Sequence, residues 1–317
     1  MEVKKIAQAL LQKGFVTQAS DLYVFPHGSS YDLSYRYHHE VETYKQVDKQ
    51  IGEKLILYLK YLGGMDIAEK RKAQVGSATV SLSNRSGRVR LSSVGDYMNR
   101  ETLVVRFLHH SQKETAHHYV FPEQSQLLVS GVKKQGLYLF SGPTGAGKST
   151  TMYELAKKRY QQKRKQIITI EDPVEIEQTD FLQFQVNEKI DQTYESLIKV
   201  CLRHRPDILI IGEIRDQETA KMVVRAALTG HMVFSTIHAT DKESVWLRLL
   251  DFDIPKIELE QCVKGIIYQE LIPVTGANKY SVLYDVSLNG VETNWEESVA
   301  TAYKNKLISK ETYHNMQ

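Results

Sequence analysis

The fold follows from one stretch of the chain, Gly142-Pro143-Thr144-Gly145-Ala146-Gly147-Lys148-Ser149-Thr150. It matches the pattern G-x-x-x-x-G-K-[ST], in which a glycine-rich turn points backbone N–H groups at phosphate oxygens. A Cβ atom at the glycines would obstruct that turn. An apolar run at residues 136–140 precedes the stretch as an expected strand, and residues 151–160 follow it as an expected helix. Because a helix N-terminus attracts anions, the sequence predicts that the whole stretch lines a phosphate site. A glycine-rich turn that matches by chance is the alternative.

Two side chains of this stretch have the chemistry that a nucleotide triphosphate requires. Lys148 is expected to reach the outer phosphates, and the hydroxyl of Ser149 is expected to ligate Mg²⁺. The pattern therefore predicts ATP with Mg²⁺ as the ligand of this part of the chain.

Bulk composition allows two domains and favours the cytoplasm. The chain has 317 residues, of which 42% are hydrophobic and 25% charged, and its net charge of +3 does not by itself imply a nucleic-acid partner. Cys201 and Cys262 are the only cysteines, which are too few for a disulfide framework or a four-thiolate zinc site. The sequence has neither a secretory apolar core nor an apolar run of about 20 residues. We expect a soluble cytoplasmic protein that binds no zinc and can dock on a membrane protein.

Residues 1–108 are predicted to form a small α+β domain. Apolar residues recur at helical spacing over residues 3–13 and 48–63, and alternating segments indicate strands between and after them. Arg90 lies on an alternating segment that places it on one face with Arg88, and Arg106 lies on a further expected strand at residues 102–108. On the residues alone, both could be solvated strand arginines.

Two polar segments invite functional interpretations that have plainer alternatives. Residues 109–122 are predicted to be the interdomain linker, and the histidines of residues 109–118 suggest either a metal site or solvated side chains. The basic run at residues 157–165 could contact acidic lipid headgroups or could be the solvated end of a helix.

Residues 123–317 alternate between expected strands and helices, and three of the strands end in functional groups. Residues 166–170 precede the acidic turn Glu171-Asp172-Pro173-Val174-Glu175, whose carboxylates are costly to cluster without a cation. Residues 207–212 deliver Glu213, and residues 229–238 place His231 and His238 around a further strand. An open parallel sheet with its ligand at the carboxyl edge is the expected layout. A turn rich in Asp and Pro, and core histidines, are the alternatives.

In this order, the four segments resemble those of the type II/type IV secretion ATPase family. The phosphate loop matches residues 142–150, the acidic box residues 171–175, the Walker B segment residues 208–216 and the histidine box residues 229–240. The N-terminal half is similar as well, through residues 19–22, residues 64–71 and the strand arginines Arg90 and Arg106. The resemblance implies a RecA-like P-loop ATPase domain that follows an N-terminal α+β (PAS-like) domain.

The same resemblance implies roles for individual residues. Glu175 would orient and polarise the attacking water, with Glu171 and Asp172 in support, and Glu213 would handle Mg²⁺ together with Ser149. Arg90 and Arg106 would neutralise charge on the γ-phosphate, and His238 would act as a phosphate sensor. Members of the family work as a ring of six that drives a membrane-embedded platform protein at the cytoplasmic face of the inner membrane.

Within the family, the chain is most similar to the ATPases that assemble the competence pseudopilus of Gram-positive bacteria. It is short and has no Cys-x-x-Cys around residues 263–273, and the resemblance implies that it begins at the family's second N-terminal domain. The implied function is an ATP-hydrolysing motor for pilus assembly in DNA uptake, without direct contact to nucleic acid. A type II secretion or conjugation-type ring ATPase, and an ATP-binding scaffold without turnover, are the rival functions.

Overall fold

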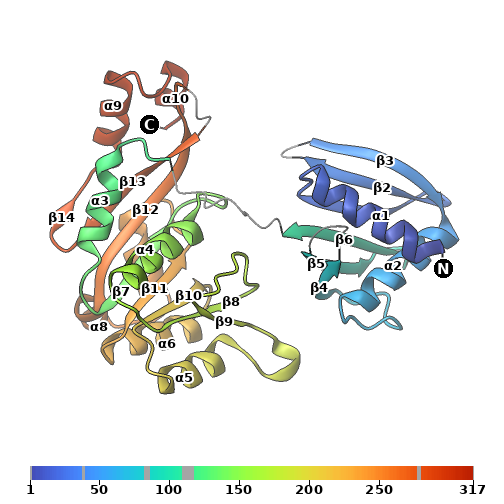
Figure 1. Ribbon diagram of the computed structural model, residues 1–317, viewed down its shortest axis with the longest axis horizontal. Helices are drawn as coiled ribbons and strands as arrows, with labels where there is room; N and C mark the ends of the chain where they lie inside the picture. Colours follow the sequence, from blue (N-terminus) through green and yellow to red (C-terminus); the bar gives the residue numbers. More distant parts are fainter. Residues whose placement is uncertain (1, 38–39, 82–85, 109–117, 277–279, 317) are drawn as a thin grey trace. The chain divides into compact units, whose positions relative to one another are not determined.

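The computed structural model describes residues 2–37, 40–81, 86–108, 118–276 and 280–316, and Figure 1 shows their secondary structure. The chain divides into two compact units, residues 1–112 (unit 1) and 113–317 (unit 2). Most of the predicted linker, residues 109–117, lies outside the described residues. In the described parts of the chain, no helix combines the length and the apolar character needed to cross a bilayer.

Unit 1 is an antiparallel sheet with helices on one face. Its elements are α1 (Glu2–Val16), β1 (Asp21–His27), β2 (Ser30–Tyr37), β3 (Glu40–Asp48), α2 (Lys49–Leu62), β4 (Gln74–Ser81), β5 (Ser86–Gly95) and β6 (Glu101–Leu108). The strand order is β3-β2-β1-β6-β5-β4. The predicted α+β character is confirmed, but β2 and β3 did not appear in the prediction. All but one of the residues of β3 are exposed, so that strand lacks the apolar alternation on which a prediction depends.

The core of unit 1 forms where α1 and α2 pack on the inward residues of the strands. Phe15 of α1 meets Phe107 of β6 edge to face, and the hydroxyl of Tyr35 in β2 donates to the backbone oxygen of Leu10. Gly52 of α2 lies against the ring of Tyr31, where a Cβ would be 2.4 Å from a ring carbon. The opposite face of the sheet carries the polar residues, since side chains alternate along a strand.

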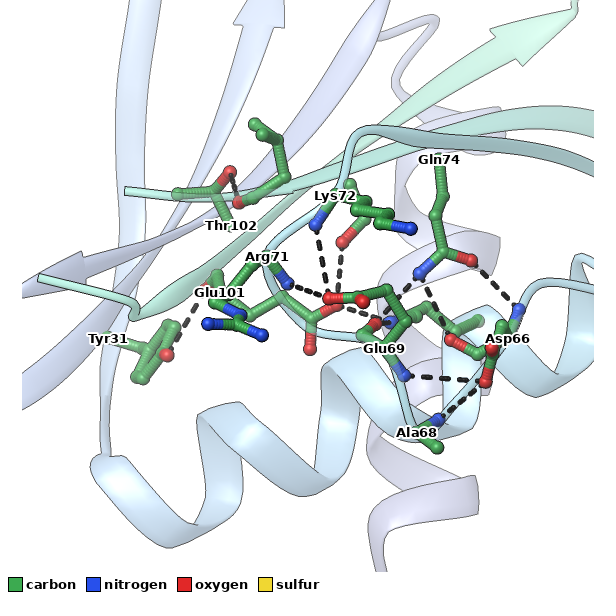
Figure 2. A network of polar contacts seen from close by, with 12 residues as sticks. Tyr31, Asp66, Ala68, Glu69, Arg71, Lys72, Gln74, Glu101 and Thr102 are labelled. Atoms are coloured by element: carbon green, nitrogen blue, oxygen red, sulfur yellow. Dashed lines mark hydrogen bonds and ion pairs between the residues drawn. The ribbon is translucent and has the colours of Figure 1, made fainter. Parts of the chain in front are cut away.

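A loop between α2 and β4 is held in a defined shape by its own acidic residues (Figure 2). Asp66 accepts backbone N–H groups of Ala68 and Glu69, and the Glu69 carboxylate accepts those of Arg71 and Lys72. Beneath the loop, the buried ammonium of Lys60 donates to the Glu69 backbone oxygen at 2.6 Å and pairs with the carboxylate of Glu101. The loop is therefore tied to the core of unit 1 by a hydrogen bond from an ammonium that also forms a buried ion pair.

Unit 2 contains a mostly parallel sheet with helices on both faces. Its elements are α3 (Pro122–Gly131), β7 (Gly136–Ser141), α4 (Lys148–Gln162), β8 (Ile167–Glu171), β9 (Leu182–Gln185), the 3₁₀ helix η1 (Glu188–Ile190), α5 (Tyr194–Arg203), β10 (Ile208–Ile214), α6 (Gln217–Leu228), β11 (Met232–Ile237), α7 (Lys242–Asp251), α8 (Lys256–Cys262), β12 (Val263–Pro273), β13 (Tyr280–Leu288), β14 (Val291–Glu292), α9 (Trp295–Lys304) and α10 (Lys310–Asn315). The strand order is β14-β13-β12-β7-β11-β10-β8-β9, in which β13 and β14 are antiparallel to their neighbours.

The central strands of unit 2 are buried on both faces, as their uninterrupted apolar runs predict. In β7, Leu137 and Leu139 belong to the core beneath α5 and α6, whereas Tyr138 and Phe140 belong to the core beneath α3 and α4. The parallel neighbours β7, β11, β10 and β8 end at one edge of the sheet. The predicted α/β fold is thereby confirmed, and this edge receives the motif residues.

Candidate active site

The phosphate loop connects β7 to α4, and glycines with positive φ form its backbone. Gly142 has φ +137°, and Gly145 and Gly147 each have φ +83°. A Cβ at Gly142 would lie 2.1 Å from the backbone oxygen of Gln269, so only glycine fits there. Among the described residues, no side chain caps the N-terminus of α4. The first N–H groups of α4 therefore remain available to an anion.

Lys148 lies buried at the first position of α4 and folds back over the loop. Its ammonium donates to the backbone oxygens of Gly142 at 2.8 Å and Pro143 at 2.9 Å. Burial lowers the pKa of Lys148, and the Glu213 carboxylate opposes that effect. The ammonium is thus already in the loop, where phosphate oxygens can replace the two carbonyl oxygens as its acceptors. Ser149 and Thr150 follow it in the first turn of α4 and are half-buried.

Gln269 supports the loop from the neighbouring strand β12. Its side chain is entirely buried, and its amide donates to the backbone oxygen of Ala146 at 2.6 Å. Its backbone oxygen also faces Gly142, as described above. Gln269 lies more than a hundred residues beyond the loop in sequence, in an apolar run without a motif, so no local signal identifies it.

Asp172, Glu213 and His238 follow or end three neighbouring strands and form a chain of charged contacts with Arg215. Asp172 and Glu213 face Arg215, and His238 faces Glu213. The guanidinium of Arg215 donates to Glu213 and lies 3.6 Å from the Asp172 carboxylate. His238 Nε2 lies 3.7 Å from the second oxygen of Glu213. The contact with Glu213 raises the pKa of Arg215, which keeps the guanidinium charged. Arg215 carries no predicted role of its own within the Walker B segment, although its position two residues after Glu213 places both on one side of an extended chain.

The acidic turn after β8 divides between two environments. Glu171 is buried, where its carboxylate accepts hydrogen bonds from the hydroxyls of Tyr153 in α4 and of Thr169, the latter at 2.6 Å. Burial raises the pKa of Glu171 above its usual range. Asp172 faces Arg215 instead, and Glu175 is exposed to solvent. The strand period of two explains why adjacent carboxylates point to opposite sides.

Tyr194, the first residue of α5, approaches the charged contacts around Arg215 from beneath β10. A Cβ on Gly212 would lie 3.0 Å from the Tyr194 hydroxyl, so the glycine permits this approach. The hydroxyl is buried and makes no hydrogen bond to the residues that the structure describes. Burial raises the pKa of Tyr194, and the charges of Asp172 and Glu213 raise it further. The sequence offered only an aromatic residue at a helix start, which is not a functional signal.

The strand arginines lie in unit 1, on the face of the sheet that its helices leave open. Arg90 and Arg106 are direct cross-strand neighbours of β5 and β6. Arg106 Nε donates to the buried carboxylate of Asp21 at 2.9 Å, and two-thirds of the arginine side chain remains exposed. Two arginines thus lie side by side on adjacent strands, and their role in catalysis stays a prediction.

The two cysteines are buried in the apolar core of unit 2, in α5 and at the end of α8. Burial raises the pKa of Cys201 and of Cys262 to about 11, so both thiols are protonated near neutral pH. Within the described ranges, no group of three or more His, Cys, Asp or Glu residues is arranged to hold a metal by itself.

Comparison with known proteins agrees with this geometry. A family model described as "Type II/IV secretion system protein" matches residues 1–310. Competence protein ComGA of Streptococcus pneumoniae (strain ATCC BAA-255 / R6) is 44% identical over 270 residues, which cover 85% of this chain and 85% of that protein. Competence protein ComGA of Bacillus subtilis (strain 168) is 38% identical over 272 residues, which cover 85% of this chain and 76% of that protein.

Among solved structures, the pilus retraction motor PilT with bound ADP is similar with a TM-score of 0.75 at 22% identity. The match covers 98% of this chain and 96% of that one, and it supports the RecA-like fold. The family assignment rests on two findings: the sequence identities to the ComGA proteins, and the match to the family model over residues 1–310. The chain belongs to the type II/IV secretion system protein family.

Proposed function

We propose that the chain is an ATP-hydrolysing motor that powers assembly of a competence pseudopilus. The observation that carries the proposal is the position of Lys148. Its ammonium lies in the glycine-rich phosphate loop, and the Glu213 carboxylate is close enough to raise its pKa against the effect of burial. The names of the ComGA relatives supply the cellular process. A site of this kind serves phosphoryl transfer, in which positioning and charge neutralisation supply most of the catalysis.

The donor set at the loop fits Mg²⁺. Ser149 offers a hydroxyl and Glu213 a carboxylate, which are the hard oxygen ligands that this ion prefers, and Mg²⁺ commonly takes its remaining ligands from water and phosphate. When bound, the ion would neutralise charge on the phosphates. One oxygen of the Glu213 carboxylate contacts Arg215, so the ion and the guanidinium would compete for this side chain.

The remaining polar residues of unit 2 have separate roles in this proposal. The exposed carboxylate of Glu175 orients and polarises the attacking water. Buried Glu171 acts as a positioning residue, because its contact with Tyr153 ties the turn after β8 to α4. Asp172 holds Arg215, and His238, beside Glu213, senses whether the outer phosphate is present.

Arg90 and Arg106 complete the proposal as arginines that neutralise charge on the γ-phosphate. Such an arginine contributes roughly 10³–10⁵-fold to the rate in other phosphoryl-transfer systems. Because they belong to unit 1, their action requires both units. In the cell, six copies form a ring at the cytoplasmic face of the membrane and drive a polytopic platform protein.

An ATPase assay on the purified full chain, with Lys148→Ala beside it, tests the proposal. We expect Mg²⁺-dependent hydrolysis by the wild type and its loss in the variant. The substitution removes the ammonium that would contact the outer phosphates, while the fold is kept. Size-exclusion chromatography with mass measurement reports the ring. Near-normal turnover by folded Lys148→Ala protein would contradict the site, and turnover that rises strongly with single-stranded DNA would favour a nucleic-acid translocase.

A further inference from the structure

A second concave site lies at the edge of the unit 2 sheet where the parallel strands begin. It is a hollow of about 840 Å³, formed by the connections that lead into β7, β8, β10 and β11. The phosphate loop follows the carboxyl end of β7, so the two sites occupy opposite edges of the sheet. We call this site the basic hollow and define it by Lys133, Lys134, Lys165, Arg205, Asp207 and His231.

The basic hollow concentrates positive charge. Its four Lys and Arg residues face one carboxylate, a net of three positive charges, which equals the net charge of +3 of the whole chain. The carboxylate of Asp207 is already engaged, because one oxygen accepts the Gln166 backbone N–H at 2.8 Å and the other lies 3.4 Å from Lys165 Nζ.

The remaining cations have no counter-charge of their own in the described parts of unit 2. Lys133, Lys134 and Arg205 are exposed and form no ion pair there. Like charges that share a concave surface raise the local potential and attract anions. The basic run at residues 157–165 contributes its last residue, Lys165, to the lining of the hollow.

The backbone around the basic hollow is held firmly. The Tyr138 hydroxyl accepts the N–H of Lys134 at 3.1 Å and donates to its carbonyl oxygen at 2.9 Å. The Gly136 N–H donates to the His231 backbone oxygen at 3.0 Å. His231 Nδ1 lies 3.2 Å from the Ala226 carbonyl oxygen, a contact that fixes the orientation of the ring. A ligand would therefore meet groups that are already positioned.

We propose that the basic hollow binds an anion that carries two or more phosphate groups. Several cations around a hollow of this volume suit an extended charge better than a single phosphate ion. Its lining contains no Phe, Tyr or Trp, and its one ring is that of His231, so the series of aromatic side chains on which successive bases of a single strand stack is not provided. The phosphates can belong to a free oligophosphate or to clustered lipid headgroups, and these sources share the chemistry that the hollow recognises.

Calorimetric titration of full-length Lys148→Ala protein with inorganic tripolyphosphate tests the proposal, because that background weakens phosphate binding at the loop. The hollow variant adds Lys134→Glu and Arg205→Glu, and the control adds Lys221→Glu and Lys54→Glu, which reverse the same charge at exposed sites elsewhere. We expect at least about a tenfold loss of affinity in the hollow variant, since two charge-assisted contacts are removed. The control should retain its affinity.

Failure of tripolyphosphate to bind the Lys148→Ala protein, or equal losses in the hollow variant and the control, would overturn the proposal. Sedimentation with vesicles of phosphatidylglycerol and phosphatidylcholine, against phosphatidylcholine alone, separates the two sources. Sedimentation lost only in the hollow variant supports lipid headgroups as the source. Tripolyphosphate binding without sedimentation of the wild type supports a free anion.

Discussion

Arg215 organises the charged residues at the strand ends. Its guanidinium pairs with Glu213 and lies 3.6 Å from the Asp172 carboxylate, so one positive charge serves both acids. The same contact occupies Glu213, the carboxylate that we assign to Mg²⁺. Arg215 therefore stabilises the unliganded site and competes with the metal for its ligand.

Glu213→Gln should keep ATP binding and lose turnover. The amide preserves the shape of the side chain but lacks the negative charge with which we expect Glu213 to bind Mg²⁺. We therefore expect kcat to fall by at least about tenfold, while the affinity for ATP changes much less. Steady-state kinetics and nucleotide titration give the two quantities. Glu218→Gln, an exposed carboxylate of α6, is the matched control. Wild-type kcat for Glu213→Gln at saturating Mg²⁺ would remove Glu213 from the mechanism.

Lys60→Ala should destabilise unit 1 severely. The change leaves Glu101 buried without its cation, and breaking one partner of a buried pair costs about 3–5 kcal/mol of unfolding free energy. Chemical denaturation measures the loss. Lys54→Ala, on the exposed side of the same helix, should change stability by less than about 0.5 kcal/mol. Equal stability of the two variants would show that the buried pair contributes nothing.

Among the elements, β12 determines the shape of the phosphate loop. It runs parallel to β7 as its neighbour, and Gln269 contacts the loop through both its amide and its backbone oxygen. The loop is therefore supported by a strand that contains none of the recognised motifs. This contact explains why the first glycine of the loop cannot be replaced.

Gly142→Ala should impair nucleotide binding more than Gly145→Ala. Both positions have positive φ, which costs a non-glycine residue roughly 1–2 kcal/mol. At Gly142 the added Cβ would also collide with the Gln269 backbone, whereas at Gly145 it would meet no atom within 4 Å. Titration with a fluorescent ATP analogue compares the affinities. Comparable losses in the two variants would argue against the contact with β12.

On the scale of the whole molecule, the residues to which we assign catalytic roles belong to two compact units. The phosphate loop and the strand-end carboxylates belong to unit 2, and the paired strand arginines belong to unit 1. A motor that converts nucleotide state into movement needs such a division, because hydrolysis then depends on the relation between the units. The arginines test this idea directly.

Arg90→Ala and Arg106→Ala should each reduce kcat by at least about tenfold, or 1.4 kcal/mol, and change nucleotide affinity much less. Contacts made mainly in the transition state have this signature. Arg88→Ala, two residues from Arg90 on the same face of β5, is the matched control. If kcat stays unchanged in both variants, these arginines serve only the surface of unit 1.

The sequence by itself determined the phosphate loop, the parallel sheet around it and the acids at the strand ends. These features depend on short spacings, such as the glycines before Lys148 and the apolar run before Glu213, which fix local backbone shape and burial. Strand β3 was not predicted because all but one of its residues are exposed, so its sequence lacks the alternation of apolar and polar residues that indicates a strand.

Only the tertiary structure separated Glu171 from Asp172, which are adjacent in sequence but point into a buried pocket of hydroxyls and toward Arg215, respectively. It also brought Gln269 to the phosphate loop, Tyr194 to Gly212, and the cations of three connections into the basic hollow. The physical reason is the same in each case. Such contacts join residues distant in the chain, so they depend on sheet order and packing and leave no periodic or local pattern in the sequence.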